Sequence, residues 1–285
     1  MAIYLGDTAI KKVYLGATEI KKIYQGTTLL YSSFTYDPDL LTYIDSLVTP
    51  LSEGQLALLN TFIVNLKSGL SIANLSDAFD VMYILAGETA ESSLRNMVRR
   101  AHDATAVNAP LFTALEGFTG NGINAYINCN YNLLNDSIRY TVYDASLGVY
   151  TRTFATIDIM IAGALAGTWM RISSSRTWLH INSNDDAPRV YVLAGGAGMR
   201  IGSLIGTDGT GLFLYMNKNK YGATTAGDIN GILNEGVTLL KYSTYYSPSQ
   251  ISFAFTGRGF TQSEANIITD VFEAYMDANG KGVIA

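Results

Sequence analysis

Residues 169–181, WMRISSSRTWLHI, contain two short segments of alternating character on either side of a serine-rich turn. Side chains two positions apart in a strand point to the same face of a sheet. In a hairpin formed by these segments, Trp169 and Arg171 share a face, and so do Trp178 and His180. An exposed indole beside a hydrogen-bond donor offers a sugar ring an apolar surface with a polar edge. The stretch therefore predicts a β-hairpin that carries four candidate glycan-binding residues.

The same hairpin can instead place both indoles in the protein core. This is the favoured interpretation, because tryptophan is largely buried in most folds. Met170 and Ile172 would then face outward and need a covering partner. A second aromatic group, formed by Tyr242, Tyr245 and Tyr246, has the same two interpretations. Alternation alone does not choose between the two faces.

Further strand-like segments extend on both sides of this hairpin. They are rich in β-branched and aromatic residues, and turn clusters such as Asn121-Gly122 separate them. Many short strands at this spacing predict a β-sandwich. The glycine-rich run 195–202 does not fit a dinucleotide-binding loop and is predicted as a turn or bulge. The expected strands are Ala125–Cys129, Ile138–Tyr143, Ile157–Ala162, Trp169–Ile172, Trp178–Ile181, Arg189–Leu193, Leu212–Asn217, Thr238–Tyr245 and Ile251–Phe255.

Helical patterns precede and follow these strands. Asp37-Pro38 predicts the start of a first helix, with an apolar stripe that reaches Val48. A capping box at Ser52–Gln55 opens a second helix. A third helix is expected from Ser76 to Ala86, and a second capping box at Thr261–Glu264 opens a closing helix.

The N-terminal segment repeats a ten-residue phrase three times: YLGDT, YLGAT and YQGTT. Each glycine is a turn signal between β-branched or aromatic flanks, which predicts a β-meander with strands near 2–5, 8–15, 18–25 and 28–32. So small a sheet cannot bury enough surface to stand alone, so it must pack on the main domain, on copies of itself or on another protein. We favour a docking module. The candidate anchoring residues are Tyr4, Leu5, Ile10, Val13, Tyr14, Leu15, Ile20, Ile23 and Tyr24.

These patterns divide the 285 residues into three parts. Residues 1–35 form the docking module, residues 36–110 a helical linker region, and residues 111–285 a β-sandwich with its closing helix. The net charge of −5 argues against a nucleic-acid partner, because phosphate contacts need clustered lysine and arginine. The apolar stretch Ile157–Met170 is too short to span a bilayer, so no membrane insertion is expected.

The sequence contains no motif that indicates a catalytic site. The single cysteine, Cys129, rules out an internal disulfide and is predicted as a buried thiol. A catalytic triad through His180 lacks the Gly-x-Ser-x-Gly turn. Glycoside hydrolysis needs two carboxylates across a cleft, whereas Glu116, Asp158 and Glu235 stand apart in the sequence. We therefore expect no enzyme, no cofactor and no metal site.

Four stretches resemble structural proteins of tailed bacteriophages. They are the N-terminal YLG-x-T-x-I-K-K repeat, the helical region Leu41–Gly87 ending in YILAG, the glycine-rich FTGNG at 118–122, and ISFAFTG at 251–257 with the capped helix that follows. Between Tyr140 and Asn234 the strands match only in general character. The resemblance implies a concanavalin-like, or laminin-G-like, jelly roll.

The resemblance also implies a role. It predicts a non-enzymatic virion protein in a fibre, spike, baseplate or capsid appendage, anchored by its N-terminal repeat. Its partners would be other virion proteins of the capsid, tail or baseplate, copies of itself, often as a trimer, and a host surface glycan. The alternatives are a carbohydrate-binding module in its own right and a glycan-degrading appendage enzyme. The fold expected throughout is mainly β: an N-terminal β-meander, a short helical region, and a jelly roll with a C-terminal helix.

Overall fold

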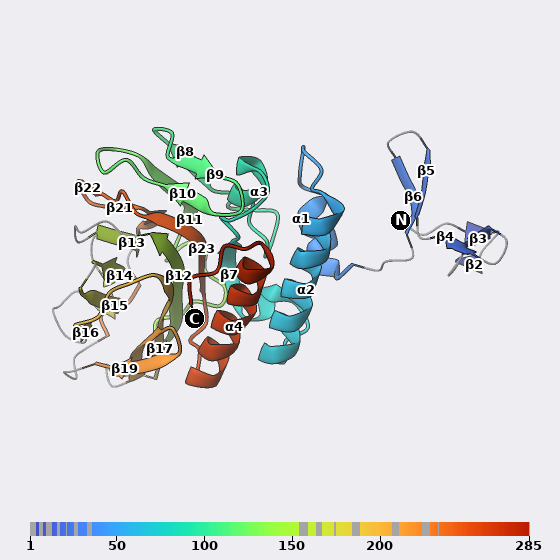
Figure 1. Cartoon of the computed structure of the whole chain (residues 1–285). Coiled ribbons are helices and arrows are strands. Elements are labelled where there is room, and N and C mark those ends of the chain that lie inside the picture. The colour runs from blue at the N-terminus through green and yellow to red at the C-terminus, as the bar shows by residue number, and fades with distance from the viewer. Residues whose placement is uncertain are drawn as a thin grey trace. The chain divides into compact units, whose positions relative to one another are not determined.

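The computed structural model describes residues 36–284 except 154–158, 164–166, 174, 184–188, 207–210, 224–228 and 233, together with six short strands between residues 4 and 32 (Figure 1). For the strands before residue 36 and for residues 159–163 it describes the backbone pairing only. Contacts divide the chain into two units, Met1–Pro38 and Asp39–Ala285.

The first unit contains three two-stranded hairpins. Leu5 pairs with Thr8, Leu15 with Thr18 and Gln25 with Thr28, so each hairpin corresponds to one copy of the repeated phrase. The strands expected over 8–15 and 18–25 are each described as two shorter strands. The bounds are β1 (Tyr4–Leu5) with β2 (Thr8–Ala9), β3 (Val13–Leu15) with β4 (Thr18–Ile20), and β5 (Lys22–Gln25) with β6 (Thr28–Ser32).

The anchoring role of this unit stays a prediction. Ile10 lies outside the described residues. For the other candidate anchoring residues, namely Tyr4, Leu5, Val13, Tyr14, Leu15, Ile20, Ile23 and Tyr24, the structure describes strand pairing but no side-chain contact.

The second unit is built on two antiparallel sheets that face each other, as the sequence predicts. The eight-stranded sheet has the order β19 (Asn219–Gly222), β18 (Leu212–Met216), β17 (Gly198–Ile205), β12 (Asp144–Thr153), β23 (Gln250–Gly257), β10 (Gly117–Thr119) and β9 (Leu111–Thr113), with β7 (Phe79–Tyr83) also paired to β23. The seven-stranded sheet has the order β16 (Val190–Val192), β15 (Thr177–Ser183), β14 (Gly167–Ile172), β13 (Ile159–Gly163), β20 (Gly236–Leu239), β11 (Tyr126–Asn132) and β8 (Thr105–Val107).

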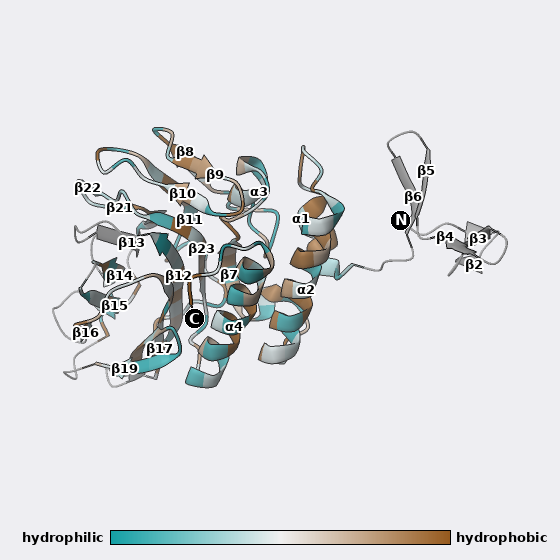
Figure 2. Ribbon diagram, viewed as in Figure 1, coloured by the Kyte–Doolittle hydropathy of each residue, from teal (hydrophilic) through white to brown (hydrophobic). Residues whose placement is uncertain are grey.

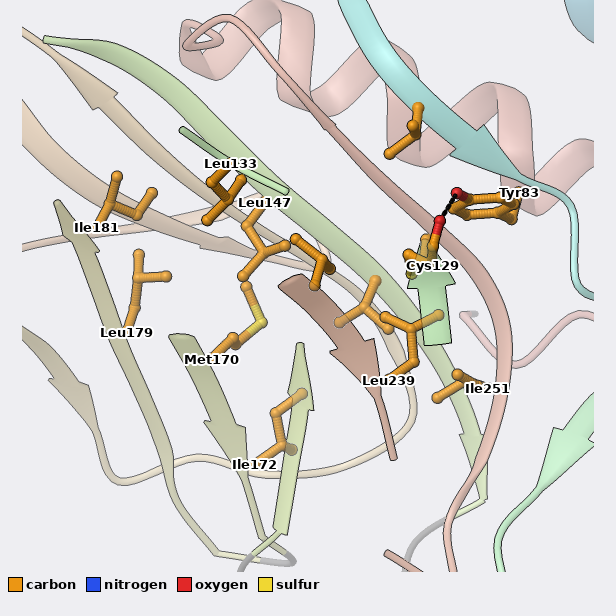
Figure 3. Packing of buried hydrophobic residues seen from close by; sticks show 14 of the residues in the cluster. Tyr83, Cys129, Leu133, Leu147, Met170, Ile172, Leu179, Ile181, Leu239 and Ile251 are labelled. Carbon is orange, nitrogen blue, oxygen red and sulfur yellow. Dashed lines mark hydrogen bonds between the residues drawn. The ribbon is translucent and has the colours of Figure 1, made fainter. Parts of the chain in front are cut away.

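Aliphatic side chains from both sheets fill the space between them (Figure 3). Leu147 comes from the eight-stranded sheet, and Met170 and Leu179 come from the seven-stranded one. Cys129 is buried in the same cluster, which confirms the prediction for this thiol, and burial raises its pKa to about 12. The Tyr83 hydroxyl donates a hydrogen bond to the Cys129 carbonyl at 3.0 Å and so connects β7 to β11 across the core (Figure 3).

Two helices, α2 (Glu53–Leu70) and α4 (Gln262–Ala278), cover the outer face of the eight-stranded sheet (Figure 1). Phe272 of α4 stacks on Phe253 of β23 with ring centroids 4.4 Å apart, and Phe62 of α2 lies 6.1 Å from Phe253. Figure 2 shows hydrophobic and hydrophilic residues alternating along α4, the pattern of a helix with one buried side. The remaining helices are α1 (Pro38–Ile44), α3 (Ala90–Leu94) and a 3₁₀ turn, η1 (Leu75–Asp77).

By length and composition, the segment Glu53–Asp77, which contains α2, is long and apolar enough to cross a membrane. Core helices of soluble proteins pass the same test. In this structure the apolar residues Leu59, Phe62 and Leu66 of α2 are buried. The apolar side of α2 is therefore used for packing against α4 and the sheet.

Of the two expected capping boxes, the one at Thr261 is confirmed and the one at Ser52 only in its N-cap half, because the Ser52 N–H donates to Glu88 and not to Gln55. The Ser52 side chain accepts a hydrogen bond from the Gln55 backbone N–H at 3.3 Å, and Thr261 and Glu264 form the expected reciprocal capping box. The expected apolar stripe of the first helix is wrong beyond Ile44. The helix ends there, and the side chain of Val48 is 83% exposed.

The third expected helix, Ser76–Ala86, is wrong. Residues 79–83 form strand β7, and all five are buried. A short strand covered on both faces reads as a continuous apolar run, which periodicity cannot distinguish from a buried helix.

Two strand predictions and one turn prediction are also wrong. The strand expected over Thr238–Tyr245 is interrupted at Leu240 and Ser243, which have positive φ, so that β20 ends at Leu239 and a separate hairpin follows. Residues 138–143 do not form a strand, because the buried Asp80 carboxylate accepts the backbone N–H groups of Ile138, Arg139 and Tyr140. The run 195–202, expected as a turn, enters the central strand β17 at Gly198. A Cβ at Gly202 would lie 2.4 Å from the side chain of Leu179, so glycine permits the close approach of the two sheets there.

Candidate functional site

The four candidate glycan-binding residues lie together on the outer face of the seven-stranded sheet. β14 and β15 form the expected hairpin, in which Trp169 pairs with His180 and Arg171 with Trp178. The alternate residues Met170, Ile172, Leu179 and Ile181 belong to the core cluster on the other face. The strand period of two therefore places all four candidates on the side away from the core.

The favoured interpretation, with both indoles in the core and Met170 and Ile172 facing outward, is wrong. Met170 is fully buried and Ile172 is 4% exposed, whereas Trp169 and Trp178 are half-buried. The unbranched and branched aliphatic side chains fill the narrow space between the sheets, and the period of the strand then forces the larger indoles to the opposite face.

Neighbouring strands hold the aromatic rings in pairs. Trp169 stacks on His180 with centroids 4.1 Å apart and an angle of 22° between the rings, and His180 is only 3% exposed beneath this stack. The Arg171 guanidinium lies 5.0 Å from the centre of the Trp178 ring. Tyr191 of β16 lies 5.4 Å from Trp178 on the other side of the strand pair. These contacts restrict the rotamers of both indoles before any ligand binds.

The strand on the remaining side of Trp169 is β13. Gly163 of β13 pairs with Trp169, and Thr238 of β20 follows as the next neighbour across the sheet. Trp169 therefore has a stacked partner on the β15 side and a glycine on the β13 side.

A small hairpin adds a second group of aromatic residues to this face. It consists of β21 (Lys241–Tyr242) and β22 (Tyr245–Tyr246). Tyr242 lies 6.1 Å from Trp169, and Tyr246 lies 6.1 Å from Tyr126 of β11. The Lys241 ammonium lies 4.4 Å from the centre of the Tyr126 ring.

We name these residues the aromatic face: Trp169, Arg171, Trp178, His180, Tyr191, Tyr126, Lys241, Tyr242 and Tyr246. Sequence reasoning missed Tyr191, Tyr126 and Lys241. The Val190-Tyr191-Val192 alternation contains a usable signal for Tyr191, because both valines are buried and the tyrosine is not. Nothing local identifies Tyr126 or Lys241, whose contact joins two distant parts of the chain.

Glu116, one of the carboxylates considered for catalysis, is held in ion pairs. Glu116 accepts from Arg152 at 2.7 Å and from Lys281 at 2.6 Å. The hydrogen bond from Lys281 and the charges of both partners lower the pKa of Glu116, whereas a glycosidase acid needs a raised one. Asp158 lies outside the described residues. His102 contacts the Asn130 carbonyl through Nδ1 at 2.7 Å.

No protein-family model and no curated protein matches this chain. Solved structures do resemble it. The Trypanosoma rangeli sialidase in complex with 2,3-difluorosialic acid matches with a TM-score of 0.50 and 12% identity, over 81% of this chain and 40% of that one. A botulinum neurotoxin type C structure, described as dependent on two ganglioside molecules for cell entry, matches with a TM-score of 0.48 and 11% identity, over 70% of this chain and 52% of that one.

Domain 4 of an extracellular arabinanase from Geobacillus stearothermophilus, in complex with arabinotriose, matches with a TM-score of 0.43 and 14% identity, over 67% of this chain and 98% of that one. This chain thus covers about half or less of the toxin and sialidase chains. At such low sequence identity, the similarity to these structures concerns the fold alone. The protein is therefore a mainly β protein built on a β-sandwich with a closing C-terminal helix.

Proposed function

We propose that this protein is a non-enzymatic attachment protein that binds a glycan on its aromatic face, as part of a bacteriophage appendage. The observation that carries the proposal is the placement of Trp169, Trp178 and Arg171 together outside the core. Half-buried indoles on an otherwise packed sheet contribute little to the core. Their stacked and cation–π contacts make them rigid, which lowers the entropy cost of binding a sugar ring.

The fold alone does not assign this function, because one fold can host many unrelated sites. The likeness to the sialidase, at 12% identity, likewise concerns the fold only. The chemistry of the aromatic face supports the proposal more directly. Sugars present C–H groups that pack on aromatic rings, and hydroxyl groups that need donors and acceptors at the ring edge.

The virion role rests on the N-terminal repeat and on the resemblance of both ends of the chain to tailed-phage structural proteins. In this proposal the three hairpins of the first unit attach the protein to the capsid, tail or baseplate. Copies of the chain then assemble with one another, as homotrimers or another homo-oligomer. Small two-stranded sheets gain stability from such a neighbour, because they bury little surface alone.

Glycan binding by matched variants tests the first half of the proposal. We expect Trp169→Ala and Trp178→Ala to abolish binding on a glycan array that includes host surface polysaccharides. The control is Phe213→Ala on the eight-stranded sheet, which removes a half-buried ring that also has a lysine over it, Lys220 at 3.7 Å. Binding that survives both tryptophan substitutions, or a wild-type protein that binds no glycan, would contradict the proposal.

Particle incorporation tests the second half. A phage encoding a protein without residues 1–35 should produce particles that lack it, while the truncated protein still folds. Normal incorporation of the truncated protein would show that the repeat is not the anchor. Release of reducing ends from a bound polysaccharide would instead identify the protein as an enzyme, and we expect none.

A further inference from the structure

We propose that the aromatic face selects carboxylate-bearing glycans, an inference that rests on the proposed function. The first observation is the distribution of charge. The chain has 24 acidic and 19 basic residues, yet the seven strands of this sheet contain no aspartate or glutamate. Arg171 is their one lysine or arginine. The sheet is therefore free of negative side chains in a protein of net charge −5.

The second observation is the position of Lys241. Its ammonium lies 4.4 Å from the centre of the Tyr126 ring and 5.9 Å from that of Tyr246, so two rings hold it in place. Among the residues that the structure describes, no carboxylate lies within ion-pair distance of it. The rings attract the cation without neutralising its charge. Lys241 is thus an oriented positive charge on the aromatic face.

The third observation is that the positively charged residues lie close in the chain to the aromatic rings proposed to bind the sugar. Lys241 is followed by Tyr242, whose ring lies 6.1 Å from Trp169. Arg171 lies on the strand that also carries Trp169, two residues away, so their side chains share a face. A sugar ring packed on the Trp169–Tyr242 pair would lie beside the β21–β22 hairpin that carries Lys241. A uronic or sialic acid meets this arrangement, because it joins a C–H surface to a carboxylate on one ring.

Several acidic residues flank these strands in the sequence, of which Asp158, Asp185 and Asp186 lie outside the described residues. Asp103 precedes β8 by two residues and is paired with Arg95 at 2.7 Å. Glu235 immediately precedes β20, at the end of the sheet. A nucleic acid, the other common polyanion, would need clustered lysine and arginine, whereas this face has one of each. A carboxylated glycan needs only a few cations beside aromatic platforms.

The test compares each acidic polysaccharide with its own neutral form. The probes are polygalacturonate and oligosialic acid, each before and after chemical reduction of its carboxylates to hydroxymethyl groups, with dextran sulfate as a polyanion without carboxylates. Dissociation constants are measured by titration calorimetry at 50 and 500 mM NaCl. Because exposed ion pairs are individually weak, we expect at least one acidic form to bind roughly tenfold more tightly than its neutral form at low salt, and this preference to shrink at high salt.

Matched lysine variants assign the preference to this site. Lys241→Met keeps the length of the side chain and removes its charge, and should lower the acidic-over-neutral ratio about fivefold or more. Lys220→Met removes the comparable lysine over Phe213 on the other sheet and should leave the ratio unchanged. Circular dichroism and the melting temperature confirm that both variants are folded.

The outcomes separate this inference from the proposed function. Equal binding of acidic and neutral forms, equal losses in both lysine variants, or dextran sulfate binding as tight as that of the carboxylates would overturn the carboxylate selection. Binding that still depends on Trp169 would leave the proposed function in place. A wild-type protein that binds neither these probes nor any glycan on the array overturns both.

Discussion

The two sheets of the sandwich differ in whether helices cover their outer faces. The outer face of the eight-stranded sheet is covered by α2 and α4 (Figure 1). Its buried rings Phe253 and Tyr150 pack against Phe272 of α4. The outer face of the seven-stranded sheet has its own rings, but among the described residues no helix packs over them. Similar aromatic side chains therefore serve stability on one side and are available for recognition on the other.

Individual contacts show that the side covered by the helices is tightly packed. A Cβ at Gly148 of β12 would lie 2.0 Å from the Phe255 ring, so glycine is needed where this ring rests on the neighbouring strand. The Tyr150 hydroxyl donates to Glu273 of α4 at 2.6 Å and satisfies a buried polar group. On the open side, cross-strand pairs such as Trp169 with His180 provide the main packing.

The largest expected effect is the loss of a ring from the covered side. Phe272→Ala removes a fully buried side chain that contacts Phe253, Phe62 and Tyr150, and should lower the free energy of unfolding by about 3–5 kcal/mol. Trp178→Ala on the open face should cost about 1 kcal/mol or less, because a half-buried ring leaves no cavity when removed. Urea unfolding of both variants measures the difference. Equal costs would refute the assignment of separate roles to the two faces.

The next effect concerns the link between the covered sheet and the loop that leads to β12. The Asp80 carboxylate is 1% exposed and accepts the N–H groups of Ile138 and Tyr140 at 2.8 and 2.7 Å. Asp80→Asn weakens these charge-assisted bonds and should cost about 2–3 kcal/mol in unfolding free energy. Hydrogen exchange should then speed up at residues 138–140 first. Unchanged exchange there would contradict the clamping role.

A smaller effect distinguishes the two ends of α2. A Cβ at Gly69 would lie 2.5 Å from the Ile267 side chain of α4, whereas a Cβ at Gly54 meets nothing within 4 Å. Gly69→Ala should therefore lower stability by about 1 kcal/mol, and Gly54→Ala should raise it by about 0.5 kcal/mol. Thermal unfolding measures both. The same sign for both variants would mean that α2 does not pack against α4 as described.

The smallest effect is a pH dependence at the covered side. The pKa of Glu116 is lowered by its hydrogen bond from Lys281 and by the charge of Arg152. A lowered carboxyl pKa stabilises the folded state above the ordinary value of 4.5, and this contribution is lost as the pH falls through the folded-state pKa. The stability gap between wild type and Glu116→Gln should thus be constant near neutral pH and close in acid. A gap that widens on acidification would contradict this sign.

Much of the fold could be predicted from local patterns. The caps at Ser52 and Thr261, the closing helix and the hairpin at residues 169–181 each depend on neighbouring residues only, and each is confirmed. The strands β7, β12 and β17 escaped prediction. They are covered on both faces, so their sequences lack the alternation that reveals a half-buried strand.

The candidate site was predicted in part. Trp169, Arg171, Trp178 and His180 were correctly placed on one hairpin, but the favoured interpretation buried the indoles. Tyr126 and Lys241 were missed because they are 115 residues apart in sequence and meet only through the pairing of β11 with β20. No local pattern encodes such a contact.

By itself, the sequence determined the period of each exposed strand, the turns between the hairpin strands and the ends of the long helices, since these depend on backbone preferences over a few residues. The tertiary structure alone decided which side of the 169–181 hairpin faces inward. An alternating strand is equally regular with either side buried, and only the shape of the opposing sheet, which accepts Met170 and Leu179 in the core, settles that choice. It thereby turned both indoles outward.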